Sequence, residues 1–156
     1  GIGECFKKNI KVLASLGFDL CLIDTPPTIG NGLSSALYAS DYVVSPIELE
    51  RYSIEGIVLM NVTIANIRKV NPELKFLGMI PSMVNSRNLR HRNYLDALNK
   101  AYPQLIIPTS IGLRSSIADA FETGIPVWKD KRSAARVAAK EVRALAQYVF
   151  TKMGVA

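Results

Sequence analysis

The chain has 156 residues, of which 49% are hydrophobic and 21% are charged, and this composition excludes a disordered chain. Two cysteines outside any CxxC pair disfavour a disulfide scaffold or a zinc site, and a single histidine excludes a multi-histidine metal centre within the chain. No apolar run reaches the roughly 18–20 residues that span a bilayer, and no basic-then-apolar leader opens the chain. These features predict one cytoplasmic domain, with a leader further upstream left open.

The net charge of +6 is unevenly distributed along the chain. Residues 1–80 carry a net charge of −1, whereas residues 81–156 carry +7. Arginine outnumbers lysine in the second half, and the guanidinium fork matches the oxygens of a phosphate. The asymmetry therefore indicates an anionic partner such as a nucleic acid backbone. A basic surface that serves only solubility is the alternative.

The predicted elements of the first half are, in chain order, a helix over 4–16, a strand over 19–24, a helix over 31–39, a strand over 42–46 and a helix over 54–70. The run over 19–24 is apolar without alternation, which is typical of a parallel strand covered on both faces. Gly17 should end the first helix, and Ser53 is expected to cap the last.

The second half continues with a strand over 75–84, a helix over 88–101, a strand over 104–107, a helix from Ser115 or Ser116 to Thr123, and a helix over 134–152. Pro81 predicts a bulge or an early exit from its strand. Gly124 is expected just past a helix end, and Ser133 is expected to cap the final helix. Strands that alternate with helices predict the α/β class, with a doubly wound, mostly parallel sheet and helices on both faces.

Asp24 is the strongest local sign of a functional site. It follows an apolar strand directly, and open α/β sheets bind ligands at the carboxyl ends of their strands. A carboxylate there needs compensation, which Mg²⁺ would supply. The alternative is an Asp that caps the turn after its strand.

The segment from Phe18 to Ile57 resembles the Walker B region of ParA/Soj/MinD-type deviant P-loop ATPases. Its matching features, in chain order, are an apolar strand that ends in Ile23–Pro27, a leucine- and alanine-rich helix at Leu33–Ala39, a strand at Tyr42–Pro46 and an acidic-aromatic segment at Glu50–Gly56. Farther along, Ile107–Arg114 and Gly124–Val127 resemble two later segments of the family. The form is closest to plasmid partition protein ParA, and the resemblance runs from about residue 4 to residue 152.

The glycine-rich KGG-x-GKT loop that opens this family occurs nowhere in the 156 residues. The resemblance therefore implies that residues 1–156 are the C-terminal part of a single ParA-type P-loop NTPase domain, without its N-terminal strands. Such a piece should show an incomplete sheet with an uncovered edge and apolar face, and hence poor solubility or oligomerisation. It should hydrolyse ATP negligibly, because phosphoryl transfer depends on the groups of the missing loop.

The resemblance also implies the site residues for ATP and Mg²⁺. Asp24 would hold the metal through water, while Asn85 and the loop of Pro108, Thr109 and Ser110 would contact the adenine. An amide side chain both donates and accepts hydrogen bonds, which suits the edge of adenine. The alternatives are that Asn85 only forms a turn and that Pro108 only ends a strand. No residue of the chain is assigned a catalytic role.

For partners, the resemblance implies an ATP-bound homodimer that binds nonspecific DNA through Arg87 and Arg114. Neighbouring cations widen that patch, namely Arg90, Arg92, Lys131 and Arg132. The whole protein would act in plasmid or chromosome partition at the nucleoid, stimulated by a ParB-type centromere-binding protein. A membrane role is not expected, because the end Thr151–Ala156 is too short and not basic enough for an amphipathic anchor. The alternative functions are a nucleotide-independent DNA- or partner-binding module, and another regulator of the same ATPase superfamily.

Overall fold

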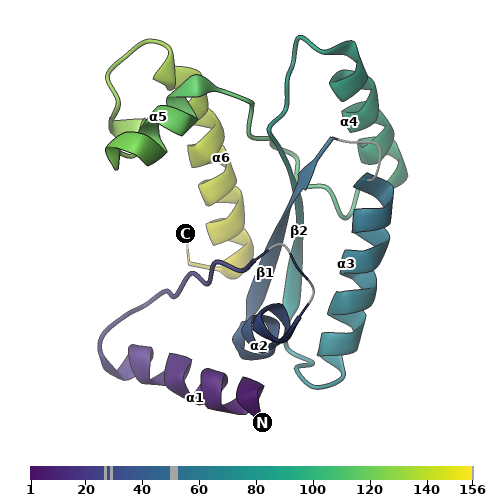
Figure 1. Cartoon of the computed structure of the whole chain (residues 1–156), viewed down its shortest axis with the longest axis vertical. Helices are drawn as coiled ribbons and strands as arrows, with labels where there is room; N and C mark the ends of the chain where they lie inside the picture. Colours follow the sequence, from purple (N-terminus) through teal and green to yellow (C-terminus); the bar gives the residue numbers. More distant parts are fainter. Residues whose placement is uncertain (27, 29, 50–52, 156) are drawn as a thin grey trace. The chain divides into compact units, whose positions relative to one another are not determined.

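The computed structural model describes residues 1–26, 28, 30–49 and 53–155 (Figure 1). Two motif positions of the sequence analysis, Pro27 and Glu50–Tyr52, lie outside the described residues. The elements are, in chain order, α1 (Ile2–Ser15), α2 (Asn31–Ala39), β1 (Tyr42–Glu48), α3 (Ser53–Arg68), β2 (Lys75–Ser82), α4 (Leu89–Ala101), α5 (Ser115–Thr123), the 3-10 turn η1 (Val127–Lys129) and α6 (Ala135–Met153). The chain divides into two compact units, Gly1–Val43 with Ile57–Phe76 and Val44–Gly56 with Leu77–Ala156.

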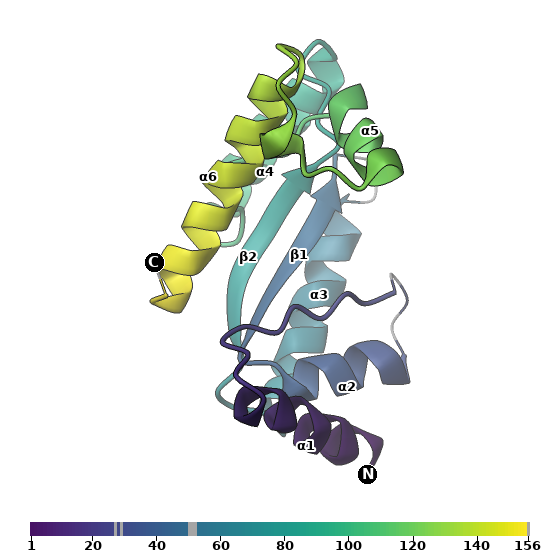
Figure 2. The same cartoon turned by 90° about the vertical axis from the view of Figure 1, so that its left-hand side faces the viewer.

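The first unit is built on a small apolar core. Leu37 of α2, Ile64 of α3 and Leu74 are buried together. The buried side chain of Asn71 ties the end of α2 to the turn after α3, because its Nδ2 donates to the carbonyls of Leu37 at 3.0 Å and Ser40 at 2.9 Å. α1 packs against α2 (Figure 2).

The prediction of a strand over residues 19–24 is wrong. In the structure residues 18–26 form no regular secondary structure and run as an extended coil (Figure 2). Phe18, Leu20 and Leu22 are 60%, 52% and 92% exposed. A strand exists only through hydrogen bonds to a neighbouring strand, and no described segment forms such a ladder with these residues. Residues 19–24 therefore have the apolar pattern of a buried strand, but among the described residues no neighbouring strand pairs with them.

β1 and β2 pair as a two-stranded sheet with both strands running in the same direction (Figure 2). The prediction of strands over 42–46 and 75–84 is thus confirmed, with ends at Glu48 and Ser82. β2 ends at Ser82, one residue after Pro81 and two residues before the predicted end, in line with the predicted early exit at this proline. The α/β class is confirmed, although the described sheet has fewer strands than predicted.

The predicted strand over 104–107 reduces to a single parallel bridge between Ile106 and Met79. A second parallel bridge joins Gly112 to Val84, so the segment follows β2 without forming a continuous ladder. The N–H of Ile107 donates to Met79, but the next ladder bond would need an N–H on Pro81 of β2, which proline lacks, and this accounts for the interruption. Gly78 permits the close approach of this segment, because a Cβ there would lie 2.9 Å from the carbonyl oxygen of Leu105.

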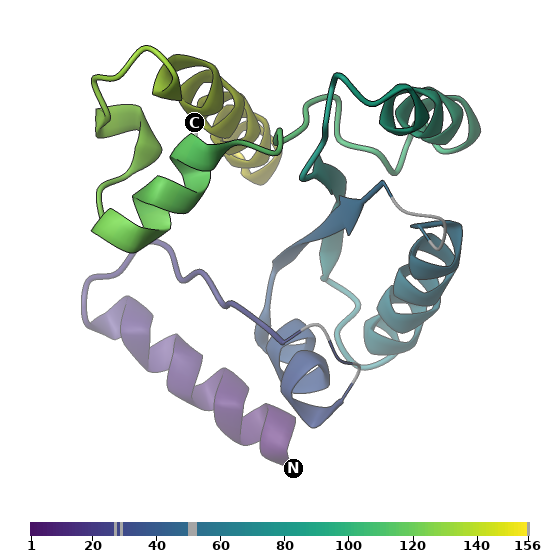
Figure 3. The same ribbon diagram turned by 45° about the horizontal axis from the view of Figure 1, so that its top comes forward.

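The second unit has its own core at the C-terminal end of the chain. Val127 of η1 packs with Ala135 and Ala138 of α6, and α5 contacts α6 (Figure 3). Gly124 ends α5 in the left-handed conformation, at a φ of 66°, as predicted. The serine caps predicted for α5 and α6 are wrong, because neither helix has a side-chain cap hydrogen bond.

Candidate functional site

A cavity of about 230 Å³ lies in the second unit, where β1 and β2 end. Its lining residues come from the end of β1, from the turn after β2, from α4 and from the segment before α5. They are Glu48, Leu49, Met83, Asn85, His91 and Leu113. The carboxyl ends of parallel strands are where α/β sheets bind ligands. The cavity thus brings one of the predicted site residues, Asn85, to the expected edge of the sheet.

Asn85 uses its side chain in a turn and still keeps a donor group available. Its Oδ1 accepts a hydrogen bond from the backbone N–H of Arg87 at 3.1 Å, so the turn-forming interpretation is confirmed. Its Nδ2 group makes no hydrogen bond to the described part of the chain. Its backbone N–H donates to Nδ1 of His91 at 3.2 Å. A ligand in the cavity could therefore accept a hydrogen bond from the amide group of Asn85.

The backbone just before Asn85 is held in an uncommon conformation. Met83 has a φ of 53°, in the left-handed region that costs a non-glycine residue about 1–3 kcal/mol. Two hydrogen bonds hold the next residue, from Val84 N–H to Ile111 at 3.0 Å and from Leu113 N–H to Val84 at 3.0 Å. The cavity wall is therefore fixed before any ligand arrives, and this is the arrangement that a preorganised binding site needs.

The other predicted base contacts lie beside the cavity but not in its lining. Pro108, Thr109 and Ser110 lie between the two bridges at Ile106 and Gly112, whereas Leu113, which lines the cavity, directly follows the second bridge. Pro108 is exposed, and Thr109 and Ser110 are half-buried. Their contact with a base stays a prediction.

Asp24, the predicted metal ligand, is an exposed residue of the coil in the first unit. The described residues contain no cluster of three His, Cys, Asp or Glu side chains that could hold a metal by themselves. Magnesium at nucleotide sites commonly takes one or two carboxylates and completes its shell with phosphate oxygens and water. Among the described residues, Asp24 follows no strand and lines neither of two cavities, so its role as a metal ligand stays a prediction.

Arg114, predicted to bind DNA, is held by an acid of the same unit. Its Nη2 donates to Oε1 of Glu141 at 2.6 Å and its Nε donates to Oε2 at 3.0 Å, while the N–H of Gly112 donates to the same Oε2 at 3.1 Å. We call these three residues the Glu141 clamp. The guanidinium lies over Gly112, where a Cβ would stand 3.0 Å from Nε. The clamp thus fastens the segment that carries Leu113 to α6.

The ionisation of Glu141 depends on this clamp. Burial opposes the charged form, but the hydrogen bonds from Arg114 and Gly112 and the charge of Arg114 outweigh it and hold the pKa of Glu141 below its ordinary value of 4.5. The hydrogen bond to Glu141 in turn raises the pKa of Arg114, against the effect of burial.

We expect the substitution Glu141→Ala to lower the free energy of unfolding by about 1–2 kcal/mol at neutral pH, because it leaves charged and backbone donors without an acceptor in a half-exposed position. The folded-state pKa of Glu141 is depressed, so the contribution of the clamp is complete above pH 4.5 and is lost as the pH falls through the folded-state value. Urea unfolding over a series of pH values measures this difference.

Glu122→Ala is the matched control, because Glu122 is an exposed glutamate on α5 with no ion pair among the described residues. Its effect on unfolding should be small at every pH. A Glu141→Ala effect that stays constant as the solution is acidified would contradict the clamp.

The remaining predicted cations fall into two groups. Arg132 is held by Asp119 at 2.9 Å and Asp130 at 2.6 Å, and the same contacts raise the pKa of Arg132 and lower that of Asp130. The others are exposed and make no ion pair with the described residues, namely Arg87, Arg90, Arg92 and Lys131. The accessible part of the predicted DNA surface therefore consists of Lys131 and the three arginines at the start of α4, which we call the α4 cations.

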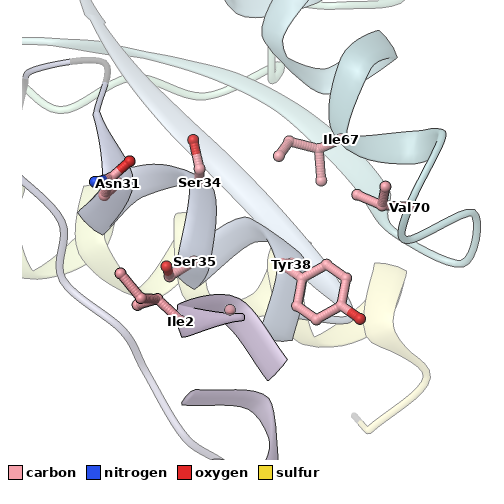
Figure 4. A pocket seen from close by; sticks show the side chains of 8 residues that line it. Ile2, Asn31, Ser34, Ser35, Tyr38, Ile67 and Val70 are labelled. Carbon is pink, nitrogen blue, oxygen red and sulfur yellow. The ribbon is translucent and has the colours of Figure 1, made fainter. Parts of the chain in front are cut away.

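A second cavity, of about 290 Å³, lies in the first unit (Figure 4). Its wall consists of residues from α1, α2 and the end of α3: Ile2, Gly3, Asn31, Ser34, Ser35, Tyr38, Ile67 and Val70. None of these lining residues is charged, and none was predicted as a site residue. The cavity offers hydroxyl and amide groups to a ligand.

Sequence reasoning missed two residues of the site, His91 and Glu141. His91 could have been noticed as the one histidine of the chain. Glu141 carries no such signal, because an acid on a helix rich in Lys and Arg looks like any surface residue.

The sequence was compared with protein families and with known proteins. A family model described as "AAA domain" matches residues 3–76. The Protein IncC of Escherichia coli is 63% identical over 150 residues, which is 96% of this chain and 41% of that protein. The chromosome-partitioning ATPase Soj of Thermus thermophilus is 30% identical over 111 residues, which is 70% of this chain and 45% of that protein. The chain therefore spans less than half of the length of these two relatives.

Among solved structures, the ATP complex of a McdA variant from Cyanothece superimposes with a TM-score of 0.80 over 95% of this chain and 57% of that one, at 21% identity. This likeness shows a shared α/β P-loop NTPase-like fold. No helix in the described ranges is both long enough and apolar enough to cross a membrane.

Proposed function

Because this chain is related to the ParA/MinD-type P-loop ATPases, we propose that it forms the base-binding and DNA-facing part of an ATPase of plasmid or chromosome partition. The observation that carries the proposal is the cavity at the ends of β1 and β2, with Asn85 in its wall. The high identity to IncC and the name of the Soj relative support the partition role.

The cavity suits an adenine base in shape and chemistry. Leu49, Met83 and Leu113 give it apolar walls for the faces of the base. The Nδ2 group of Asn85 would donate to a ring nitrogen, since it has no other partner among the described residues. Pro108, Thr109 and Ser110 lie on the neighbouring segment, from which they would close over the base.

The phosphates of ATP would be held by a part of the longer protein outside this chain, because no GK[ST] loop occurs in the 156 residues. Asp24 would hold Mg²⁺ through water, and the metal would supply charge neutralisation at the phosphates. By itself the chain should hydrolyse ATP negligibly.

The proposed partners follow from the surface charge. The α4 cations would contact the backbone of nonspecific DNA in an ATP-dependent homodimer at the nucleoid, and a ParB-type protein would stimulate hydrolysis. Arg114 and Arg132 would contribute less to DNA binding, because each is already paired with an acid.

Binding of adenosine to the 156-residue chain tests the base site directly. We expect millimolar adenosine to shift the amide resonances of Asn85, His91 and Leu113, and Asn85→Ala to weaken binding about tenfold through the loss of a buried hydrogen bond. Titrations followed by nuclear magnetic resonance give both the affinity and the place of binding. Uridine should bind more weakly than adenosine, because the smaller pyrimidine leaves part of the apolar wall uncovered.

Asn99→Ala, a change at an exposed asparagine of α4, is the matched control and should leave the adenosine affinity unchanged. If adenosine moves none of the three resonances, the proposed base site is wrong. DNA binding that persists under that outcome would favour the nucleotide-independent module instead.

A further inference from the structure

His91 is the residue that joins the cavity to the backbone of Asn85. It lies on α4, is half-buried, lines the cavity, and accepts the N–H of Asn85 on Nδ1 at 3.2 Å. It is the one histidine of the chain. An imidazole in such a place can both orient a neighbour and meet a ligand.

The hydrogen bond fixes the protonation form of this imidazole. Nδ1 accepts from Asn85, so it carries no proton, and the proton of the neutral ring is on Nε2. An imidazolium has N–H groups on both nitrogens and cannot accept. The contact seen in the structure therefore requires neutral His91.

The backbone that His91 holds is the strained part of the cavity wall. Met83 has its positive φ two residues before Asn85, and Arg87 closes the turn on the other side through Asn85 Oδ1. Without the acceptor on His91, the N–H of Asn85 would have no partner among the described residues. The orientation of the Asn85 amide group then depends on the imidazole.

We propose that neutral His91 is a positioning residue of the base-binding cavity, which sets the backbone of Asn85 and adds its own Nε2–H as a second donor for a purine base. This inference rests on the proposed function of the cavity. It makes the site selective for bases with hydrogen-bond acceptors on the ring, and it makes binding dependent on pH.

Charged groups of both signs occur around His91. Glu48 lines the same cavity from the end of β1. Arg90 and Arg92 lie on the same helix as His91, and Arg87 lies in the turn before it. Arg114, beside Leu113, is neutralised by Glu141. Protonation of His91 removes the acceptor for Asn85, and adenosine binding should then weaken.

The first measurement uses the ligand-free chain. Because there is one histidine, its two ¹⁵N resonances can be assigned without ambiguity. We expect the pattern of a neutral ring protonated on Nε2, and a shift of the Asn85 amide resonance that follows the protonation of His91 as the solution is acidified. A ring protonated on Nδ1 at neutral pH, or an Asn85 amide that ignores the titration, would overturn the inference whatever the outcome with adenosine.

The second measurement compares two variants with adenosine. His91→Ala should weaken binding about fivefold at neutral pH and abolish its pH dependence. His91→Asn places a carbonyl oxygen near the position of Nδ1 and should restore the Asn85 amide resonance and most of the affinity, also without pH dependence. Equal affinity of wild type and His91→Ala at neutral pH would overturn the role of His91 alone, whereas no binding by the wild type would overturn the proposed base site and with it this role.

Discussion

The substitution Asp24→Ala should reduce ATP hydrolysis at least 100-fold in a protein that joins this chain to the upstream part of the E. coli IncC relative, which matches 96% of the chain at 63% identity. A carboxylate that positions a metal at the phosphates supports several kcal/mol of transition-state stabilisation, and each 1.4 kcal/mol corresponds to about a factor of ten in rate. Asp24→Asn should lose nearly as much, because the amide keeps the shape but not the charge. Steady-state phosphate release measures both variants.

Asp19→Asn provides the matched control, since Asp19 is another exposed acid of the same extended segment. It should hydrolyse ATP at the rate of the parent. Binding of ATP should survive in Asp24→Ala, because Asn85 and the rest of the cavity are unchanged, so a fall in rate without a fall in base binding separates the metal role from misfolding. Parental activity in Asp24→Ala would show that this carboxylate does not serve the metal.

The helices could be predicted from the sequence because their signals are local. α2 begins and ends where the pattern places it, at Asn31 and Ala39, and α5 ends at Gly124 because glycine adopts the left-handed conformation without strain. The serine caps failed although serine is a good capping residue, because the residues before α5 and α6 are Arg114 and Ala134. A cap depends on where the chain enters the helix, and tertiary contacts set that position.

The strands were predicted less well because a strand depends on a partner that can be far away in the sequence. Residues 19–24 have the right composition, yet the described residues form no ladder with them. The segment over 104–107 has a partner in β2, but the ladder is interrupted where Pro81 of β2 has no N–H to donate. Apolar pattern therefore identifies residues that can pair, while pairing itself is decided by the neighbouring chain.

The candidate site shows the same limit. Asn85 could be predicted because it follows a strand, and the structure places it in a cavity. The acceptor of its N–H stands six residues further on, and the acid that holds Arg114 is 27 residues away. A sequence shows that an arginine is present, but only the fold shows whether an acid already neutralises it.

The α4 cations should carry most of the DNA affinity. Replacing Arg87, Arg90 and Arg92 by alanine is expected to weaken binding of the chain to a mixed-sequence duplex at least tenfold at low salt. It should also reduce the slope of log affinity against log salt by about 3, since each phosphate contact contributes about 0.9 to that slope. All three side chains are exposed and unpaired among the described residues, and the N-terminus of α4 beside them adds partial positive charge. Fluorescence anisotropy at several salt concentrations measures affinity and slope together.

The control removes the same number of charges from another helix. Arg136, Lys140 and Arg143 are exposed cations of α6, and their replacement by alanine should change the salt slope little, although it lowers the net charge equally. Arg114→Ala should likewise leave the slope almost unchanged while it destabilises the fold, because its guanidinium is already neutralised by Glu141. Equal losses in the two triple variants would mean that DNA responds to net charge alone, and an unchanged slope without the α4 cations would move the DNA surface elsewhere. Only a loss confined to the α4 cations would place the DNA-binding surface at the turn that also contains Asn85. A base bound at Asn85 would then lie close to the DNA contacts and could influence them.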